Sequence, residues 1–410
     1  MNEKSALHLF FRPLTYIYLY IFLIITTIHQ QIPILSSLPL ELICFLFAII
    51  FSLVDRLLIN NKFFIRALIL ALVAVVIPLI SSLVNNDQLQ VILEGEYRSF
   101  FKIVMLVPLL LLYVDTPKKV DELINLFILS FWLLGLIFLY RFLILNEVRD
   151  YDLRPLLKMK NGDPNFLSTY FTACVPFSLY RYGQSRKVWK GMMYAALTAF
   201  FILCTIMNQS RMGIIALVVT LLMMIFLLKW RYRLGLFFIA ISLPLGSLFF
   251  SFGNKILLRF RNMDDTSNVD RLKTLNAGIR TFLESPWFGV GWNKSSQYYY
   301  QFSEYPAFQS TTAPYEVHNT LLKIGSETGL LGMSLYCVVL ILVAAAILQA
   351  MKRNKELAII NMAVITSLMI NTMTISAGYK DIYIFLLIVI FIFSSATFKV
   401  KESMVNLLKR

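Results

Sequence analysis

The chain has 410 residues, of which 58% are hydrophobic, and a formal net charge of +15. Its mean hydropathy of +0.71 excludes a soluble helical protein of this size, because a soluble surface needs far more polar residues. Repeated runs of about 17–22 apolar residues are long enough to cross a bilayer. Composition therefore predicts an all-α polytopic membrane protein.

The apolar runs predict about twelve transmembrane helices. They lie near residues 14–29, 38–54, 66–84, 98–114, 123–145, 165–182, 190–208, 212–228, 234–252, 329–350, 357–376 and 380–397. The first run lacks a small-residue cleavage site after it, so it is interpreted as a transmembrane helix and not as a signal peptide. The sequence shows no convincing internal repeat, the feature that would favour a transporter.

Lys and Arg gather in alternate connectors between these runs, which is typical of cytoplasmic loops. Lys118 and Lys119, for example, follow the fourth run, and Arg186 and Lys187 follow the sixth. With twelve spans, this pattern predicts that both termini are cytoplasmic. The positive net charge is therefore explained by basic cytoplasmic loops, which can also attract anionic lipid head groups, and we expect no nucleic-acid partner.

This topology divides the chain into three predicted parts. Residues 1–250 form an N-terminal bundle of about nine spans. Residues 251–328 form one large extracytoplasmic loop that contains amphipathic helices. Residues 329–410 form the C-terminal transmembrane helices and a short cytoplasmic tail. The long loop is the only extended segment that is not strongly apolar, so we expect it to hold most of a functional site.

A first amphipathic helix is predicted inside the loop. Ser267 followed by Asp270 is typical of a capping box, apolar residues then recur at helical spacing, and Pro286 predicts the end of the helix. Such a helix would lie in the membrane interface, with Arg271 in its first turn and Arg280 near its end. The pattern alone leaves open whether Arg271 binds a ligand or reaches lipid phosphate.

A second helix is predicted to begin at Pro314, since proline suits the first turn of a helix. His318 would then lie near the positive end of the helix dipole, which disfavours an imidazolium. A neutral imidazole can accept a proton from a hydroxyl group. Glu316 and Glu327 are alternative bases or orienting groups, Asn319 is a further candidate, and Glu327 alternatively faces water.

Two shorter polar segments are also predicted at the outer face. Arg211 lies in the break between the seventh and eighth runs, where a lone arginine is costly unless it has a partner. A diphosphate would be such a partner, because a guanidinium binds phosphate oxygens bidentately; the alternative is an arginine that reaches the head groups. The loop 146–165 contributes Arg154 and Asp163, and its basic residues favour an anionic ligand.

The remaining residue types indicate no cofactor. The four cysteines lie inside apolar runs without metal-ligand spacing, so we expect buried hydrophobic side chains. The sequence contains neither a phosphate-binding loop nor zinc spacing, and nothing requires a metal or a nucleotide. The aromatic residues around 287–300 are expected to form an interface belt, with a platform for sugar rings as the alternative. These observations favour a donor that is already activated by a lipid-linked phosphate.

Several motifs of the C-terminal half occur in a recognisable order. They are Ser210-Arg211-Met212-Gly213, Arg271-Leu272-Lys273-Thr274-Leu275, Ser285-Pro286-Trp287-Phe288-Gly289-Val290-Gly291, His318-Asn319-Thr320-Leu321-Leu322 and Glu327-Thr328-Gly329-Leu330-Leu331-Gly332. Together they resemble the bacterial O-antigen ligase and O-antigen polymerase family. The N-terminal half resembles that family only in hydropathy.

The resemblance implies a metal-independent inverting glycosyltransferase of the bacterial inner membrane, with its active site on the periplasmic face. The donor would be a glycan on undecaprenyl diphosphate. Arg211 and Arg271, with Arg154, would hold the diphosphate, and His318, with Glu316 as a further catalytic candidate, would position or deprotonate the acceptor hydroxyl.

The resemblance leaves the identity of the acceptor open. A polymerase would use the sugar end of another lipid-linked repeat, and we favour this alternative; a ligase would use the lipid A core. Other partners would be the bilayer and proteins of polysaccharide assembly. A lipid-linked oligosaccharide transporter would instead place charged residues inside the spans around a midplane site, and a membrane scaffold would not need this set of polar residues.

Overall fold

The computed structural model describes residues 12–54, 62–85, 96–147, 163–229, 266–302 and 317–373, together with residues 375, 384, 386, 387, 390 and 391. Regular structure in these ranges is entirely helical, so the predicted all-α class is confirmed. The ninth predicted span, the sites at Arg154 and Glu316, and the expected helix start at Pro314 lie outside the described residues.

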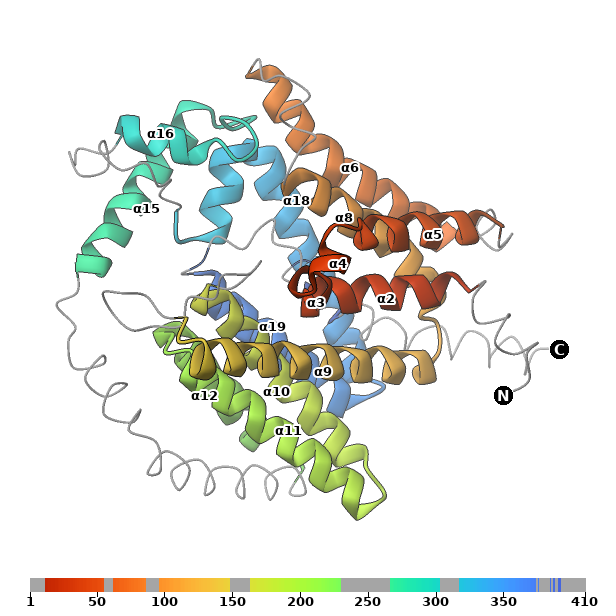
Figure 1. The fold of residues 1–410 in the computed structure, drawn as a ribbon. Coiled ribbons are helices and arrows are strands. Elements are labelled where there is room, and N and C mark those ends of the chain that lie inside the picture. Colours follow the sequence, from red (N-terminus) through yellow and green to blue (C-terminus); the bar gives the residue numbers. More distant parts are fainter. Residues whose placement is uncertain are drawn as a thin grey trace.

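The helices follow one another in the order shown in Figure 1. They are α2 (Pro13–Thr26), α3 (Ile28–Gln31), α4 (Pro33–Ser36), α5 (Leu40–Val54), α6 (Lys62–Val84), α8 (Glu96–Tyr113), α9 (Pro117–Leu139), the π-helix η2 (Tyr140–Ile144), α10 (Pro164–Gln184), α11 (Val188–Met207), α12 (Arg211–Leu227), α15 (Thr266–Glu284), α16 (Ser295–Phe302), α18 (Thr320–Met351) and α19 (Lys355–Thr372).

The first eight predicted spans, the tenth and the eleventh each coincide with one of these helices. Four described segments are both long and apolar enough to cross a membrane: Phe64–Val84, Pro117–Ile144, Val188–Met207 and Thr320–Met351. Three shorter apolar helices, α2, α5 and α12, accompany them. The protein is therefore an integral membrane protein by length and composition of its helices, and the total of twelve spans stays a prediction.

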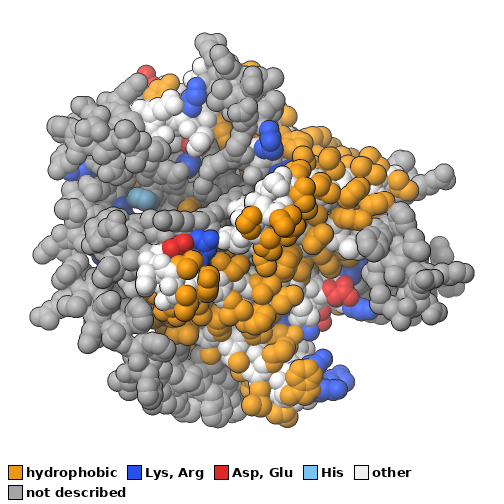
Figure 2. All heavy atoms as spheres, viewed as in Figure 1, with side chains coloured by type: hydrophobic (Ala, Val, Ile, Leu, Met, Phe, Trp, Pro, Cys, Tyr) orange, Lys and Arg blue, Asp and Glu red, His pale blue; other side chains and the backbone are white. Residues whose placement is uncertain are grey.

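The helix α10 lies at the centre of the bundle. Every residue from Leu167 to Tyr180 is buried, because α9, α11, α12 and α19 pack around this helix. The peripheral helices, in contrast, expose apolar side chains such as Ile50 of α5 and Ile69 of α6. Figure 2 shows hydrophobic side chains over much of the face that these helices form. An exposed apolar surface of this kind suits contact with lipid.

Polar contacts define one end of the bundle. Arg181 at the end of α10 lies 3.0 Å from Asp121 at the start of α9. Lys229, just after α12, lies 2.6 Å from Glu356 in the first turn of α19. We call this end the basic end, because it gathers many cationic residues, namely Lys118, Lys119, Arg181, Arg186, Lys187, Lys229, Lys352, Arg353 and Lys355.

Candidate active site

The N-termini of three helices lie at the opposite end of the bundle. Because α10 and α12 finish at the basic end, their first residues, Pro164 and Arg211, lie at the other end. The side chain of Asn208 joins the two starts by donating to the carbonyl of Pro164 over 2.8 Å. The third start belongs to α18, since the Thr320 hydroxyl donates to the carbonyl of Ile375, beyond the distal end of α19, over 2.7 Å. We call this end the site end.

Arg211 is the first residue of α12 and is partly exposed. The turn before it is fixed, because Ser210 accepts a hydrogen bond from the amide of Gly213 (3.2 Å) and donates one to Asn165 Oδ1 (3.0 Å). A Cβ added at Gly213 would lie 2.4 Å from the Cβ of Ser168, so only glycine allows α12 to approach α10 this closely. The predicted break between the seventh and eighth spans is confirmed, and its side-chain contacts hold Arg211 at the helix start.

Asp163 caps the helix α10. Its carboxylate accepts a hydrogen bond from the Asn165 amide over 2.8 Å, which satisfies one of the unpaired amides that every helix start presents. The sequence singled out Asp163 as a candidate for chemistry at the site. The structure gives its side chain a capping role at the same end as Arg211.

The helix α15 packs against the start of α18. Ala277 and Val317 are buried in one small cluster with Leu322 against it, and a Cβ added at Gly278 would lie 2.7 Å from the Val317 side chain. The predicted amphipathic helix is therefore present and ends at Glu284, before Pro286. It begins at Thr266, so Ser267 lies inside the helix and the predicted capping box at Ser267 is wrong by at least one residue.

Arg271 and Arg280 point to opposite sides of α15. Nine residues separate them, which is about two and a half helical turns. Arg271 is partly buried at the edge of the packing face, whereas Arg280 is exposed. The apolar stripe of the helix, represented by Leu272 (64% exposed) and Leu283 (66% exposed), faces away from the bundle. The structure therefore does not bring Arg280 together with Arg271.

His318 lies two residues before α18 and is exposed. Its neighbours hold it in place: Val317 is fully buried, and Asn319 caps the helix by accepting a hydrogen bond from the Leu322 amide over 2.9 Å. The sequence singled out Asn319 for chemistry, and the structure uses its side chain as a cap. His318 thus occupies the positive end of the helix dipole, as predicted, although α18 begins at Thr320.

Glu327 is buried within α18, with 1% of its surface exposed. Its Oε1 accepts a hydrogen bond of 2.6 Å from the Ser295 hydroxyl of α16. The alternative in which Glu327 faces water is therefore wrong. Nine residues of mostly helical chain place it about 13 Å along the axis from His318, so the two side chains do not act on the same hydroxyl in this arrangement.

The backbone of α18 is interrupted at Gly329, two residues after Glu327. Gly329 has φ +64°, and a Cβ there would lie 2.3 Å from the Trp287 carbonyl; a Cβ at Gly289 (φ +72°) would lie 2.3 Å from the Glu327 carbonyl carbon. Hydrogen bonds across the contact run from Val290 N to Ser326 O (2.9 Å) and from Leu330 N to Pro286 O (2.7 Å). We call this contact the glycine crossing. Both glycine-containing motifs take part in it.

The end of α6 holds the glycine crossing. The Ser81 hydroxyl donates to the Glu327 carbonyl (2.5 Å) and the Asn85 amide donates to the Gly289 carbonyl (2.9 Å). The Ser82 hydroxyl accepts from the Trp292 amide (2.9 Å). Ser81 and Ser82 belong to the predicted third span and Asn85 follows it directly; none of the three was singled out in the sequence. Their contacts cross more than 200 residues, so no local pattern could reveal them.

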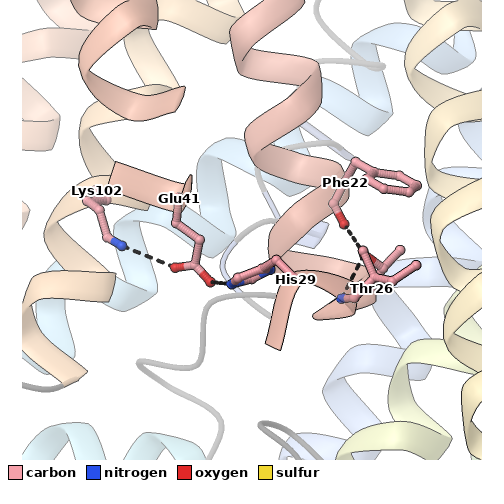
Figure 3. Close-up of polar contacts among 6 residues, drawn as sticks. Phe22, Thr26, His29, Glu41 and Lys102 are labelled. Carbon is pink, nitrogen blue, oxygen red and sulfur yellow. Dashed lines mark hydrogen bonds and ion pairs between the residues drawn. The ribbon is translucent and has the colours of Figure 1, made fainter. Parts of the chain in front are cut away.

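A buried ionic cluster lies in the N-terminal half (Figure 3). Glu41 of α5 contacts His29 Nε2 of α3 at 3.3 Å and Lys102 Nζ of α8 at 3.2 Å. A second group of polar contacts includes Gln31 of α3. The Gln31 side chain accepts a hydrogen bond from Arg141 of η2, and Arg141 forms an ion pair with Glu147 at 2.7 Å. Lys102 and Arg141 lie inside the fourth and fifth predicted spans.

The site end thus combines cationic side chains, three helix N-termini and an exposed imidazole. Helix N-termini favour anions through their unpaired amides and dipoles. Arg211 is the first residue of α12, and Arg271 lies on α15, which packs against the start of α18. Such an arrangement suits binding of a phosphate-bearing substrate beside a hydroxyl that His318 can contact.

The fold defines the class, an all-helical integral membrane protein. Comparison with protein families then identifies the group more closely. Residues 194–337 match the family model described as O-Antigen ligase. The match places this part of the chain in the O-antigen ligase and polymerase family and confirms the resemblance drawn from the motifs. The chain matches no curated protein.

Proposed function

We propose that the chain is an inverting membrane glycosyltransferase that moves a glycan from undecaprenyl diphosphate to an acceptor sugar hydroxyl during assembly of a surface polysaccharide. One observation carries the proposal. Arg211 and His318 lie at the starts of α12 and α18, Arg271 lies on α15, which packs against the start of α18, and all three residues fall inside the matched range 194–337.

In this proposal the two arginines have the same electrostatic task. Arg211, at the start of α12, and Arg271, on α15, bind the diphosphate and stabilise the negative charge that grows as it leaves. The N-termini of α10 and α12 add favourable dipoles at the same end. Because guanidinium groups and helix dipoles neutralise the leaving group, this step is assigned to the chain's own residues.

His318 acts on the acceptor. Its neutral imidazole accepts the proton of the acceptor hydroxyl as the hydroxyl oxygen bonds to the anomeric carbon. The bond from that carbon to the diphosphate oxygen breaks at the same time, and the diphosphate keeps the electron pair. Attack occurs in line with departure, which inverts the anomeric configuration. Glu316 and Arg154 remain proposed additional contacts.

We propose that the acceptor is the sugar end of another lipid-linked repeat, as in a polymerase. The lipid A core of a ligase is the second candidate, because the matched family model carries the description O-Antigen ligase. The positive-inside rule supports a cytoplasmic basic end, and hence a site end on the periplasmic face of the inner membrane.

The test uses purified protein in detergent with a lipid-diphosphate-linked repeat unit, with and without lipid A core, and products separated on a gel. A ladder from the repeat alone supports the polymerase, and product that requires core supports the ligase. Folded wild-type protein that gives neither product would contradict the proposal and favour a transporter.

Paired variants test the site. Arg271→Ala and His318→Ala should each lower the rate by at least about 100-fold, the usual contribution of a proton-transfer or charge-stabilising group. The control is Arg280→Ala, because Arg280 lies on the same helix but on its opposite, exposed side. Equal losses from Arg271→Ala and Arg280→Ala would show that the effect is general to α15 and would remove Arg271 from the site.

A further inference from the structure

An apolar cavity of about 390 Å³ lies between α6, α8 and α18. Side chains such as Ala74 of α6, Phe100 of α8 and Ile324 of α18 form its walls. This volume falls within the range of typical small-ligand sites, about 300–1,000 Å³. The cavity lies on the side of α18 that faces α6, whereas α15 packs on the side that carries Leu322.

The lining chemistry excludes water as the main occupant. A buried water needs two to four polar partners, and among the lining residues only Arg66, Thr328 and Tyr336 carry polar side-chain groups. The Thr328 hydroxyl already donates to the Ile324 carbonyl over 2.6 Å. Apolar cavities of about 150 Å³ already bind small hydrocarbons, so a larger one that adjoins the bilayer suits a hydrocarbon chain.

Residues near the basic end are among those that line the cavity. Arg66, near the start of α6, and Leu111, near the end of α8, both line it, and Lys118 of the basic end follows the end of α8 by five residues. The Tyr97 hydroxyl, near the start of α8, donates a hydrogen bond of 3.0 Å to the carbonyl of Val75 in α6. The twelve residues from Arg66 to Pro78 span about 18 Å, a little more than half of a hydrocarbon core of about 30 Å.

The charge at the cavity entrance indicates the head group. Arg66 is exposed, and its guanidinium can bind phosphate oxygens bidentately. We propose that the cavity is a lipid site in which Arg66 binds the phosphate of an anionic phospholipid from the leaflet at the basic end, and one acyl chain fills the space between α6 and α18. The α6 residues that line the cavity span about the thickness of one leaflet, which is why a bilayer phospholipid fits it.

The bound lipid would have a structural consequence for the rest of the chain. The last turn of the same helix, α6, contains Ser81 and Ser82, and Asn85 follows it; these three residues hold the glycine crossing. An acyl chain between α6 and α18 supplies the packing contacts that an empty cavity would lack. The lipid therefore fixes α6 in the position from which it reaches the crossing.

The test is native mass spectrometry of the full-length protein, purified in detergent and supplied with phosphatidylglycerol or phosphatidylcholine. The wild type should retain one phosphatidylglycerol in preference to phosphatidylcholine. Arg66→Gln should weaken this retention about fivefold, the effect of one basic residue at a membrane surface. Lys118→Gln is the matched control, since it removes a charge at the same end but away from the cavity, and it should retain the lipid.

A second pair tests the acyl chain. Ala74→Trp fills the cavity and should abolish retention, whereas Val73→Trp, at a position 44% exposed on the outer side of α6, should not. Equal retention by Arg66→Gln and Lys118→Gln, or by Ala74→Trp and Val73→Trp, would overturn the site. Copurification of a polyisoprenyl diphosphate that only Ala74→Trp displaces would reassign the cavity to the glycan donor and would also overturn it. If Ala74→Trp does not fold, the Arg66 and Lys118 pair decides by itself.

Discussion

Arg271 owes its proposed role to where it lies on α15. It is partly buried at the edge of the face that packs on α18, while Leu272 beside it points outward at 64% exposure. An arginine in this position can keep its planar guanidinium directed at a ligand of the bundle. A lysine would supply the charge but not the bidentate geometry.

We therefore expect Arg271→Lys to rescue activity poorly. Its rate should stay at least about 10-fold below that of wild type, because one of two parallel hydrogen bonds to the diphosphate is lost. The measurement is the initial rate of glycan transfer at saturating acceptor, with folding checked by size-exclusion chromatography. Full activity of Arg271→Lys together with an inactive Arg271→Ala would mean that charge alone matters.

The ionic cluster in Figure 3 leads to a prediction about stability. The side chain of Glu41 is 14% exposed and lies between His29 and Lys102, whose side chains are 7% and 9% exposed. Glu41→Gln leaves Lys102 buried without a counter-charge, which costs about 3 kcal/mol. The control is Asp115→Asn, since Asp115 pairs with Lys119 at the surface, where a salt bridge contributes about 0–1 kcal/mol.

Thermal unfolding in detergent measures the difference. We expect Glu41→Gln to lower the unfolding temperature by several degrees and Asp115→Asn to leave it nearly unchanged. Similar unfolding temperatures for the two variants would show that the cluster in the N-terminal half does not stabilise the fold. Because neither residue belongs to the proposed active site, the result does not depend on catalysis.

At the scale of elements, the glycine crossing joins α18 to the segment before α16. The interruption at Gly329 removes helical hydrogen bonds, and the segment from Pro286 to Gly291 replaces them. A side chain at position 329 would meet the Trp287 backbone at 2.3 Å and would adopt a left-handed φ. Both effects oppose any residue other than glycine.

Gly329→Ala should therefore destabilise the protein strongly and reduce transfer activity, since His318 lies just before α18. The matched control is Gly191→Ala in α11, where the new Cβ would make ordinary contacts at 3.8 Å; alanine there should be neutral or slightly stabilising. The unfolding temperatures of the two variants provide the comparison. A Gly329→Ala protein as stable as Gly191→Ala would contradict the tight crossing.

Features that depend on neighbouring residues could be predicted from the sequence, whereas features that depend on contacts between residues far apart in the chain could not. The apolar runs indicated the helices because periodicity and length are local properties. Asp163 and Asn319 were read as candidates for chemistry, because the side chains that cap a helix are also those that bind ligands. Glu327 was misjudged because its burial depends on Ser295 of α16 and on α6, more than 240 residues away at Ser81.

At the scale of the whole molecule, the two ends of the bundle have different charge and different content. The basic end gathers Lys and Arg of the connectors, and the site end gathers the starts of α10, α12 and α18. The region matched to the O-antigen ligase family begins at residue 194, so the helices before α11 lie outside it. These earlier helices contribute the buried ionic cluster and, through α6, the contacts that hold the glycine crossing.

The orientation of this bundle in the membrane is the last prediction. By the positive-inside rule, Lys118 should face the cytoplasm and Glu284, exposed at the end of α15, should face the periplasm. We would introduce Lys118→Cys or Glu284→Cys into a Cys337→Ser background, because Cys337 is exposed whereas Cys44, Cys174 and Cys204 are buried.

A membrane-impermeant maleimide, applied to right-side-out spheroplasts, should label the Glu284→Cys protein at once and the Lys118→Cys protein only after the membrane is opened. The Cys337→Ser background alone measures labelling of the buried thiols. The reverse pattern would place the site end in the cytoplasm. A lipid-linked donor would then have to react before it crosses the membrane, and a polymerase or ligase of the periplasmic face would be excluded.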